Sequence, residues 1–253
     1  MSNPTVVELV NVSVRYETPN YKSHTFKEFV FNKIRGLDGK QVIDAVKNAT
    51  FSIKAGECVA FLGHNGSGKS TLLRVVAGIL PINKEGKMNV VGRIAPMIEI
   101  SAGFDPELSG HENIYLSCTL MGLSTFEIDS RIKDIIEFSE LQKFIDMPLK
   151  NYSSGMLARL GFACATAVDP DIILADEVLA VGDANFELKC LDKIARLREA
   201  GTTVILVSHS QAAVEKFCSR GIVFYEGEIK CDAPIAEAVA VHNHWLEYRR
   251  TQH

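Results

Sequence analysis

The sequence predicts an α/β protein with a mostly parallel central sheet, an antiparallel β piece at the N-terminus and an inserted helical subdomain. Two strand-length segments, 171–177 and 202–209, each contain an uninterrupted apolar run, IILA and VILV, which is typical of parallel strands buried on both faces. Helical periodicity fills the stretches around them, and buried strands that alternate with helices indicate a layered α/β fold. The 253 residues, 47% of them apolar, suffice for one large domain with a sizeable core.

The N-terminal region is predicted to be rich in β-structure. Residues 5–16 alternate apolar and polar side chains, as a half-buried strand does. A second strand pair is expected at 43–54 and 57–62, with Ala55-Gly56 as the turn between the two strands.

An inserted segment, 17–45, interrupts this β pattern. Thr25 is followed three residues later by Glu28, which is the spacing of a capping box at a helix start. Apolar side chains then recur at helical spacing through 25–34, and the segment is therefore expected to contain a short amphipathic helix.

The rest of the chain alternates between helices and strands. Residues 1–253 are expected to form a single domain, in which the 96–168 region includes a helical subdomain inserted into the sheet domain. The elements expected here are a helix at 69–78, a hairpin at 87–94, helices over 110–168 with a break near 148–155, a helix at 185–199, a hairpin at 221–230 and a short helix within 232–253.

Composition excludes several classes of protein. The net charge of −4 argues against a protein built around a nucleic-acid backbone. No window approaches the roughly 18 apolar residues of a membrane span. The N-terminus lacks a basic region followed by an apolar run, so no secretory signal is predicted and the chain is expected to stay in the cytoplasm.

A glycine-rich loop carries the strongest functional motif. Residues 63–70, GHNGSGKS, match the phosphate-loop pattern and lie between a buried strand and a helix, which is the context that the motif requires. Glycines allow backbone N–H groups to turn toward phosphate oxygens. Lys69 is expected to reach the β- and γ-phosphates and the Ser70 hydroxyl to ligate Mg²⁺. The predicted nucleotide-binding residues are Gly63, His64, Asn65, Gly66, Ser67, Gly68, Lys69, Ser70 and Thr71.

A pair of acidic residues ends the buried strand at 172–176. Asp176 stands at the carboxyl end of that strand, where it can hold the water shell of the Mg²⁺, and Glu177 follows it. Glu177 can polarise an attacking water, so we expect it to be the catalytic base. An apolar run that ends in Asp-Glu is weak evidence by itself. With a phosphate loop about a hundred residues earlier, it becomes strong evidence for the second part of a nucleotide site.

Two more features follow in a set order. The segment 151–156, NYSSGM, precedes a helix, and His209 ends the apolar strand at 202–209. Together with the loop and the acidic pair, these motifs resemble the ATP-binding subunits of ABC transporters over nearly the whole chain. The resemblance implies a P-loop NTPase fold, ATP as substrate, Mg²⁺ as cofactor and a homodimer that sandwiches two ATP molecules.

The resemblance also implies roles for single residues. The family's LSGGQ-like signature corresponds here to Tyr152, Ser153, Ser154, Gly155 and Met156, with Tyr, Ser and Met in place of Leu, Gly and Gln. Ser154 and Gly155 would bind the γ-phosphate held by the partner subunit. Asp183 falls in the D-loop, at the expected dimer seam. His209 resembles the switch histidine that contacts the γ-phosphate.

Two positions depart from the family pattern or allow two interpretations. Glu99 stands where the family's Q-loop usually has glutamine, and it is the candidate for that coupling position. Tyr16 ends the alternating strand at 5–16 and has two interpretations, an aromatic that stacks on adenine or a partly buried tyrosine at a strand end.

A narrower resemblance is to the ATPases that export bacterial O-antigen, capsule and teichoic acid. It rests on the 25–34 helix, the SSGM signature and the string from Gly92 to Leu116. It implies that the ATPase works with two copies of a membrane-spanning permease. The polysaccharide would be lipid-linked and handled mainly by that permease. The ATPase would lie peripherally on the cytoplasmic face of the inner membrane. The inserted helix would lie where the polymer enters, or would be a plain surface loop. No carbohydrate-binding domain is expected after residue 232.

Other classes of ABC ATPase share part of this motif set. A transporter ATPase for another substrate, such as an importer or a lipid or drug exporter, shares the same motifs. A translation-associated ATPase would carry two nucleotide domains and a basic linker, and a chromosome-repair ATPase would carry a long coiled coil. Neither feature is present in the sequence.

Overall fold

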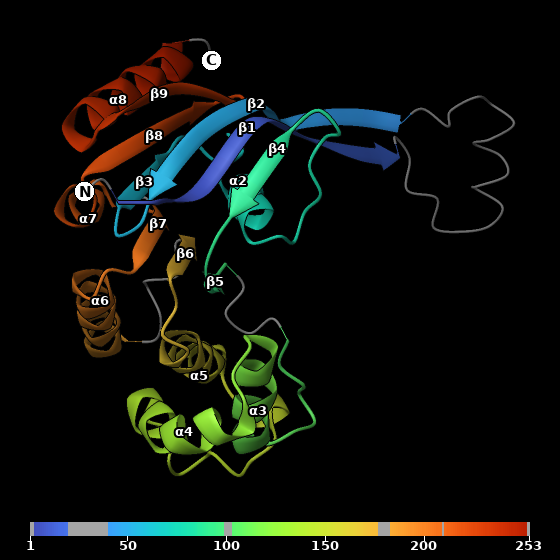
Figure 1. The fold of residues 1–253 in the computed structure, drawn as a ribbon, viewed down its shortest axis with the longest axis vertical. Helices are drawn as coiled ribbons and strands as arrows, with labels where there is room; N and C mark the ends of the chain where they lie inside the picture. Colours follow the sequence, from blue (N-terminus) through green and yellow to red (C-terminus); the bar gives the residue numbers. More distant parts are fainter. Residues whose placement is uncertain (1–2, 20–39, 99–102, 177–182, 209, 252–253) are drawn as a thin grey trace, which may run out of the picture.

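The fold is layered α/β, as the sequence predicts. The computed structural model describes residues 3–19, 40–98, 103–176, 183–208 and 210–251. A six-stranded sheet and a three-stranded sheet form the upper body in Figure 1, and a group of helices lies below them. The expected 25–34 helix lies outside the described residues.

The larger sheet is mostly parallel. Its strand order is β5-β6-β7-β3-β8-β9, with the first five strands parallel and β9 antiparallel to β8. The strands are β3 (Cys58–Leu62), β5 (Ile94–Met97), β6 (Ile172–Asp176), β7 (Thr203–Val207), β8 (Arg220–Tyr225) and β9 (Glu228–Pro234). The carboxyl ends of β3, β6 and β7 therefore share one edge, where ligands bind in open α/β sheets.

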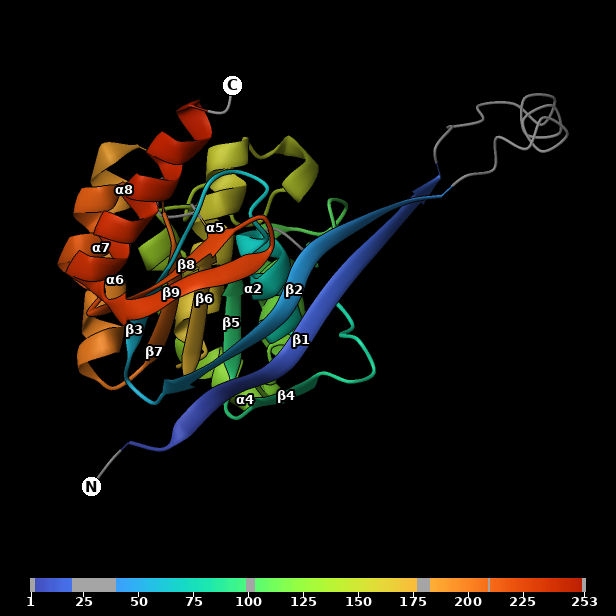
Figure 2. The ribbon, with the colours of Figure 1, turned by 90° about the horizontal axis from the view of Figure 1, so that it is seen from above.

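The smaller sheet is antiparallel and has the order β2-β1-β4. Its strands are β1 (Thr5–Pro19), β2 (Lys40–Lys54) and β4 (Lys87–Val90). β1 and β2 are long, and Figure 2 shows their paired ends extending beyond the body.

Two predicted hairpins are wrong. β2 and β3 do not pair across Ala55-Gly56, because the chain passes there from the small sheet to the large one. The expected 87–94 hairpin is likewise divided, since β4 pairs with β1 and β5 pairs with β6. Alternating side chains identify a strand but not its partner. The third predicted hairpin, β8–β9, is confirmed.

The helices fall into two groups. The helical subdomain contains α3 (Gly110–Leu120), α4 (Thr125–Ser139), the 3-10 turn η1 (Leu149–Asn151) and α5 (Ser154–Ala167). Capping boxes begin α3 and α4, and α5 connects this subdomain to the sheet. The remaining helices are α2 (Lys69–Val76), α6 (Ala184–Glu199), α7 (Gln211–Phe217) and α8 (Ile235–Thr251).

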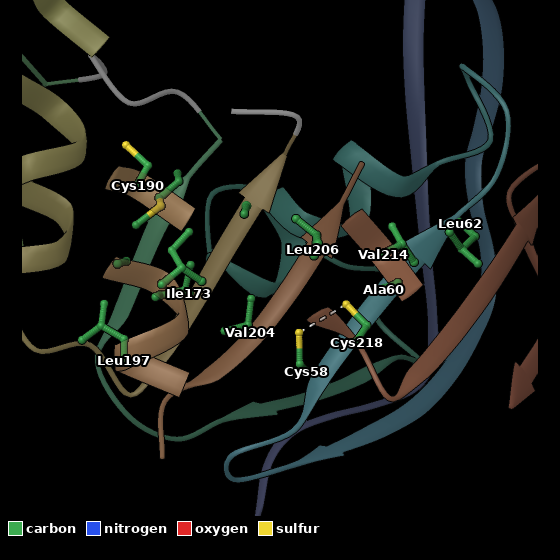
Figure 3. Close-up of a cluster of buried hydrophobic side chains, with 14 of the residues drawn as sticks. Cys58, Ala60, Leu62, Ile173, Cys190, Leu197, Val204, Leu206, Val214 and Cys218 are labelled. Carbon is green, nitrogen blue, oxygen red and sulfur yellow. Dashed lines mark hydrogen bonds between the residues drawn. The ribbon is translucent and has the colours of Figure 1, made fainter. Parts of the chain in front are cut away.

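The large sheet separates two apolar cores. Cys58, Ala60 and Leu62 of β3 face the core beneath α6, α7 and α8, whereas Val59 and Phe61 face the core shared with the small sheet and α2. Figure 3 shows the first core, in which the Sγ atoms of Cys58 and Cys218 lie 3.2 Å apart. A strand with both faces buried explains why β3 is uniformly apolar.

No helix in the described part of the chain is long and apolar enough to cross a bilayer.

Candidate nucleotide-binding site

The glycine loop follows β3 directly and turns into α2. Gly66 and Gly68 have φ angles of 83° and 104°, a region that glycine enters at no steric cost. A Cβ at position 68 would collide with the backbone oxygen of Ala45. The loop is thus pressed against β2, and only glycine at 68 allows this approach.

Lys69 is buried inside the loop that precedes it. Its side chain is 7% exposed, and its Nζ donates to the carbonyl oxygens of Gly63 at 2.7 Å and His64 at 3.0 Å. A buried ammonium is costly unless it is hydrogen-bonded, and these bonds hold the charge at the centre of the loop. This position suits an anion that lies over the loop.

Within the described part of the chain, two buried polar atoms of the loop lack a hydrogen-bond partner, and one of them supports the same interpretation. The Ser67 hydroxyl and Nε2 of His64 are buried and find no hydrogen-bond partner in the structure as described. An unpaired buried polar group costs about 1–3 kcal/mol, and such groups in native proteins call for a ligand or another explanation. The Ser67 hydroxyl can donate to an acceptor oxygen, such as one of a polyphosphate, whereas Nε2 of His64 accepts when Nδ1 of the neutral ring carries the proton.

A cleft of about 620 Å³ opens beside the loop. Tyr16 lines it, and the Tyr16 hydroxyl lies 3.4 Å from Oγ1 of Thr71 on α2. Tyr16 is half-buried and is not at the end of its strand, because β1 continues to Pro19. The aromatic ring is therefore available at the wall of a cleft of nucleotide size.

Sequence reasoning missed the other walls of this cleft. Asp44, Ala45 and Lys47 of β2 line it, and so does Glu226 at the β8–β9 turn. Arg15 pairs with Asp44 at 2.7 Å, and this pair keeps the pKa of the Arg15 guanidinium above its usual value. The β1–β2 register places Tyr16 opposite Ile43 and so brings these β2 residues to the cleft. The sequence of one strand does not determine the register with its partner.

Asp176 lies at the expected edge of the sheet. Asp176 is the last residue of β6, and β7 alone separates β6 from β3 and its loop. Among the described residues no group of three or more Cys, His, Asp or Glu could hold a metal by itself. Ser70 and Asp176 fit Mg²⁺, which usually takes few protein ligands alongside phosphate oxygens and waters.

Several predicted site residues fall outside the described residues. These are Glu99, which follows β5 after Met97, Glu177, the D-loop residues 180–182, and His209.

The signature segment forms the start of α5. Ser153 is the N-cap, and its side chain accepts a hydrogen bond from the Met156 amide at 3.2 Å. Ser154 is exposed, and Gly155 is partly exposed beside it. An open helix start of this kind presents N–H groups and positive potential to an anion.

Tyr152 has a different environment from the rest of the segment. It is 8% exposed, packs in the core of the helical subdomain and donates its hydroxyl to the Phe144 carbonyl at 2.7 Å. Burial raises the pKa of this phenol. Tyr152 therefore anchors the segment, while Ser154 and Gly155 are the residues that it presents to solvent.

An ion-pair network joins α5 to the start of α6. Arg159 of α5 contacts Asp183 at 2.7 Å and Glu140 at 2.8 Å. Asp183 caps α6 by accepting from the amides of Phe186 and Asn185, and these bonds, with Arg159, lower the pKa of the Asp183 carboxyl. The network ties the signature helix to the D-loop residue that the sequence singled out.

The comparisons with known proteins identify the family. The family model described as "ABC transporter" matches residues 46–180. The chain belongs to the ABC transporter family. The matched residues include the glycine loop, the signature segment and the acidic pair, so the motifs and the family model agree.

Curated relatives within the ABC family point to export systems. The O-antigen export system ATP-binding protein RfbB of Klebsiella pneumoniae is 44% identical over 85% of this chain and 88% of that protein. The teichoic acids export ATP-binding protein TagH of Bacillus cereus is 39% identical over 95% of this chain but 43% of that protein. RfbB of Myxococcus xanthus is 41% identical over 81% of this chain and 48% of that protein.

A solved ABC structure shares the fold. The ATP-binding cassette MJ0796, as a dimer in a post-hydrolysis state with ADP and Pi, has a TM-score of 0.72 and 25% identity and covers 90% of this chain and 98% of that one. The chain is thus an ABC ATPase, an enzyme that hydrolyses ATP.

Proposed function

We propose that this chain is the ATP-hydrolysing subunit of an ABC transporter that exports a cell-surface polysaccharide, an O-antigen-like glycan, across the bacterial inner membrane. The observation that carries this proposal is the 44% identity to an O-antigen export ATP-binding protein over most of both chains. The likeness to teichoic acid export proteins over 95% of this chain points to the same class of polymer.

Each ATP would be bound between two copies of the chain. One copy contributes the loop around Lys69 and the cleft lined by Tyr16, whose ring would stack on adenine. The other copy contributes Ser154 and Gly155, whose exposed helix start would bind the γ-phosphate. The exposure of Ser154 at that helix start supports a role in which a second chain completes the site.

The remaining motif residues would take part in hydrolysis. Ser70 would ligate Mg²⁺ directly and Asp176 through water, and the metal would neutralise charge on the β- and γ-phosphates. Glu177 would polarise the attacking water, and His209 would contact the γ-phosphate. Asp183 would lie at the seam between the copies, with its carboxylate held by Arg159.

A homodimer of this subunit would work with two copies of a membrane-spanning permease. The permease would handle most of the polysaccharide, which we propose to be lipid-linked, and the ATPase would sit peripherally on the cytoplasmic face of the membrane. The region around Glu99 would pass closure of the ATPase dimer to the permease. The inserted segment at 25–34 would lie near the entry point of the polymer.

The central test combines ATP turnover with export. In a strain lacking this gene, the Glu177→Gln variant should bind ATP, lose hydrolysis and fail to restore surface polysaccharide. The control Glu199→Gln, at an exposed position of α6, should behave as wild type. Wild-type turnover by Glu177→Gln would remove Glu177 from catalysis. If the wild-type gene restores ATP hydrolysis to the null strain but leaves its surface glycan unchanged, the proposed export function is wrong.

Transport of another substrate remains the competing hypothesis, and neighbouring genes discriminate it. Genes for glycosyltransferases and a permease beside this one would support export of a glycan. A gene for a solute-binding protein in their place would favour an importer.

A deletion tests the role of the inserted segment. Removing 25–34 should stop export and leave basal ATP hydrolysis intact, because the segment lies apart in sequence from every nucleotide-binding motif. Unchanged export would show that the segment is a surface loop without a role in transport.

A further inference from the structure

The turn between β8 and β9 forms one wall of the phosphate loop. The Phe224 carbonyl lies so close to Gly63 that a Cβ at that position would collide with it. The Gly227 amide donates to the Ser67 carbonyl at 3.2 Å, and Glu226 lines the nucleotide cleft. The conformation of the loop is therefore set in part by where this turn lies.

His64 joins the loop to the side chain of Tyr225 in the same turn. Nδ1 of His64 donates to the Asn65 carbonyl at 2.7 Å, because a carbonyl oxygen only accepts, and this bond fixes the ring. The ring packs edge-to-face with Tyr225, with centroids 5.2 Å apart and planes at 76°. Such aromatic pairs prefer this geometry.

The opposite contact of Tyr225 is with α8. Tyr225 stacks on Trp245 with centroids 4.5 Å apart and planes at 29°, and Tyr248 packs edge-to-face on Trp245 at 5.5 Å. α8 also approaches β8 closely, since a Cβ at Gly221 would lie 2.7 Å from Cβ of Ala238. α8 is thus held against the strand that carries Tyr225, as Figure 2 shows for the two elements.

These contacts form one continuous aromatic path from α8 to the phosphate loop, through Trp245, Tyr225 and His64. We propose that α8 positions the phosphate loop along this path, with Tyr225 and Trp245 as positioning residues that do not touch the nucleotide. The path holds the loop in the conformation that binds ATP, so its loss raises the ordering cost of binding rather than the barrier to hydrolysis. Because such coupling is reciprocal, ATP that binds at the loop also alters the surroundings of Trp245. This inference rests on the proposed nucleotide site at the Lys69 loop.

Steady-state kinetics separate the positioning role from a general effect on folding. Tyr225→Ala should raise KM for ATP about fivefold and change kcat less than about twofold. An aromatic pair contributes modestly to stability, and here its loss weakens ATP binding without touching the reacting groups. Tyr225→Phe keeps the ring and should retain wild-type KM. Asn243→Ala is the matched control, since Asn243 is exposed on the same helix. A wild-type KM in Tyr225→Ala, or equal KM values in the Ala and Phe variants, would overturn the proposal.

The fluorescence of Trp245 provides a second measurement that needs no activity. Trp245 is the only tryptophan of the chain, so its emission reports on this path alone. Titration of the wild-type protein with Mg·ATP should change the emission, and Tyr225→Phe should keep that change. Emission that stays constant while ATP binds, as measured by retention of radiolabelled ATP, would overturn the proposal.

The two failures can be told apart. If Lys69→Ala binds ATP as tightly as wild type, the proposed nucleotide site fails, and the positioning role falls with it. If Lys69→Ala loses ATP binding while wild-type Trp245 emission and the KM of Tyr225→Ala are unaffected, the nucleotide site stands and the positioning role alone is wrong.

Discussion

The two halves of the proposed ATP site differ in how they are built. The loop half has a buried lysine, a cleft of about 620 Å³ and walls from three separate strands or turns. The signature half is an exposed helix start whose nearest anchor, Tyr152, points into the helical subdomain. One half is a preformed pocket, and the other is an exposed surface.

This difference implies different roles for the two halves in ATP binding and in turnover. A preformed cleft restricts the loop before ATP arrives, and this reduces the ordering cost of binding. An exposed helix start contributes only once a second copy brings a phosphate to it. Substitutions in the loop half should therefore act on ATP binding, and substitutions in the signature half should act on dimer closure and turnover.

The largest effect is expected from Lys69→Ala. Removing the ammonium takes away the charge at the centre of the loop and should lower kcat/KM by at least about 100-fold, with ATP binding lost. Isothermal titration with Mg·ATP and an ATPase assay measure both. Lys87→Ala, at an exposed position of β4, is the control, and a binding defect of equal size there would deprive Lys69 of its special role.

Tyr16→Ala should have the next largest effect. Loss of a stacking surface should raise the Kd for ATP about tenfold, because base–aromatic stacking is worth about 1–3 kcal/mol per base. Tyr16→Phe keeps the ring and loses only the contact with Thr71, so its affinity should stay near wild type. Equal affinities in all three proteins would leave Tyr16 as a strand residue that only packs.

Arg159→Ala tests the signature half. Loss of the contacts to Glu140 and Asp183 should lower kcat about fivefold while ATP affinity of the isolated subunit stays unchanged, since the network orients groups that act across the dimer. Arg159→Lys retains the charge but cannot bridge both carboxylates and should recover part of the loss. Arg196→Ala, at an exposed pair on α6, is the control. A weaker ATP affinity with normal kcat would place Arg159 with the loop half instead.

The smallest effect is expected on stability. Ser153→Ala removes the N-cap of α5 and should lower the free energy of unfolding by about 1 kcal/mol in urea titrations. Ser130→Ala, on the exposed side of α4, should be neutral, because alanine favours helix there. If both variants are equally stable, the Ser153 side chain does not cap the helix in solution.

The sequence predicted the fold class and the loop half best. Glycine spacing, Lys69 and Ser70 are local features, and a strand before them and a helix after them leave few alternative structures. The second wall of the cleft was not predictable, since Asp44 and Lys47 reach it only through the pairing of β1 with β2.

Strand partners and burial explain the other differences. The two hairpins expected at 43–62 and 87–94 are wrong, because side-chain alternation does not distinguish a neighbour in one sheet from a strand in the next. The motif alone did not show which of its residues would be buried: the large aromatic side chain of Tyr152 packs in the helical subdomain, whereas Ser154 is exposed.

The central claim, that each ATP is shared by two copies, is tested most directly by mixing two defective variants. Both variants carry Glu177→Gln so that bound ATP is not hydrolysed. One variant adds Lys69→Ala, and the other adds Ser154→Glu. The glutamate carboxylate at 154 repels phosphate but is compatible with a helix start. In a heterodimer, one site combines the intact loop of one copy with the intact signature of the other. Neither variant alone should retain Mg·ATP through gel filtration, and the mixture should retain about one nucleotide per heterodimer. A mixture that retains none, or a Ser154→Glu variant that retains ATP by itself, would contradict a site shared between copies.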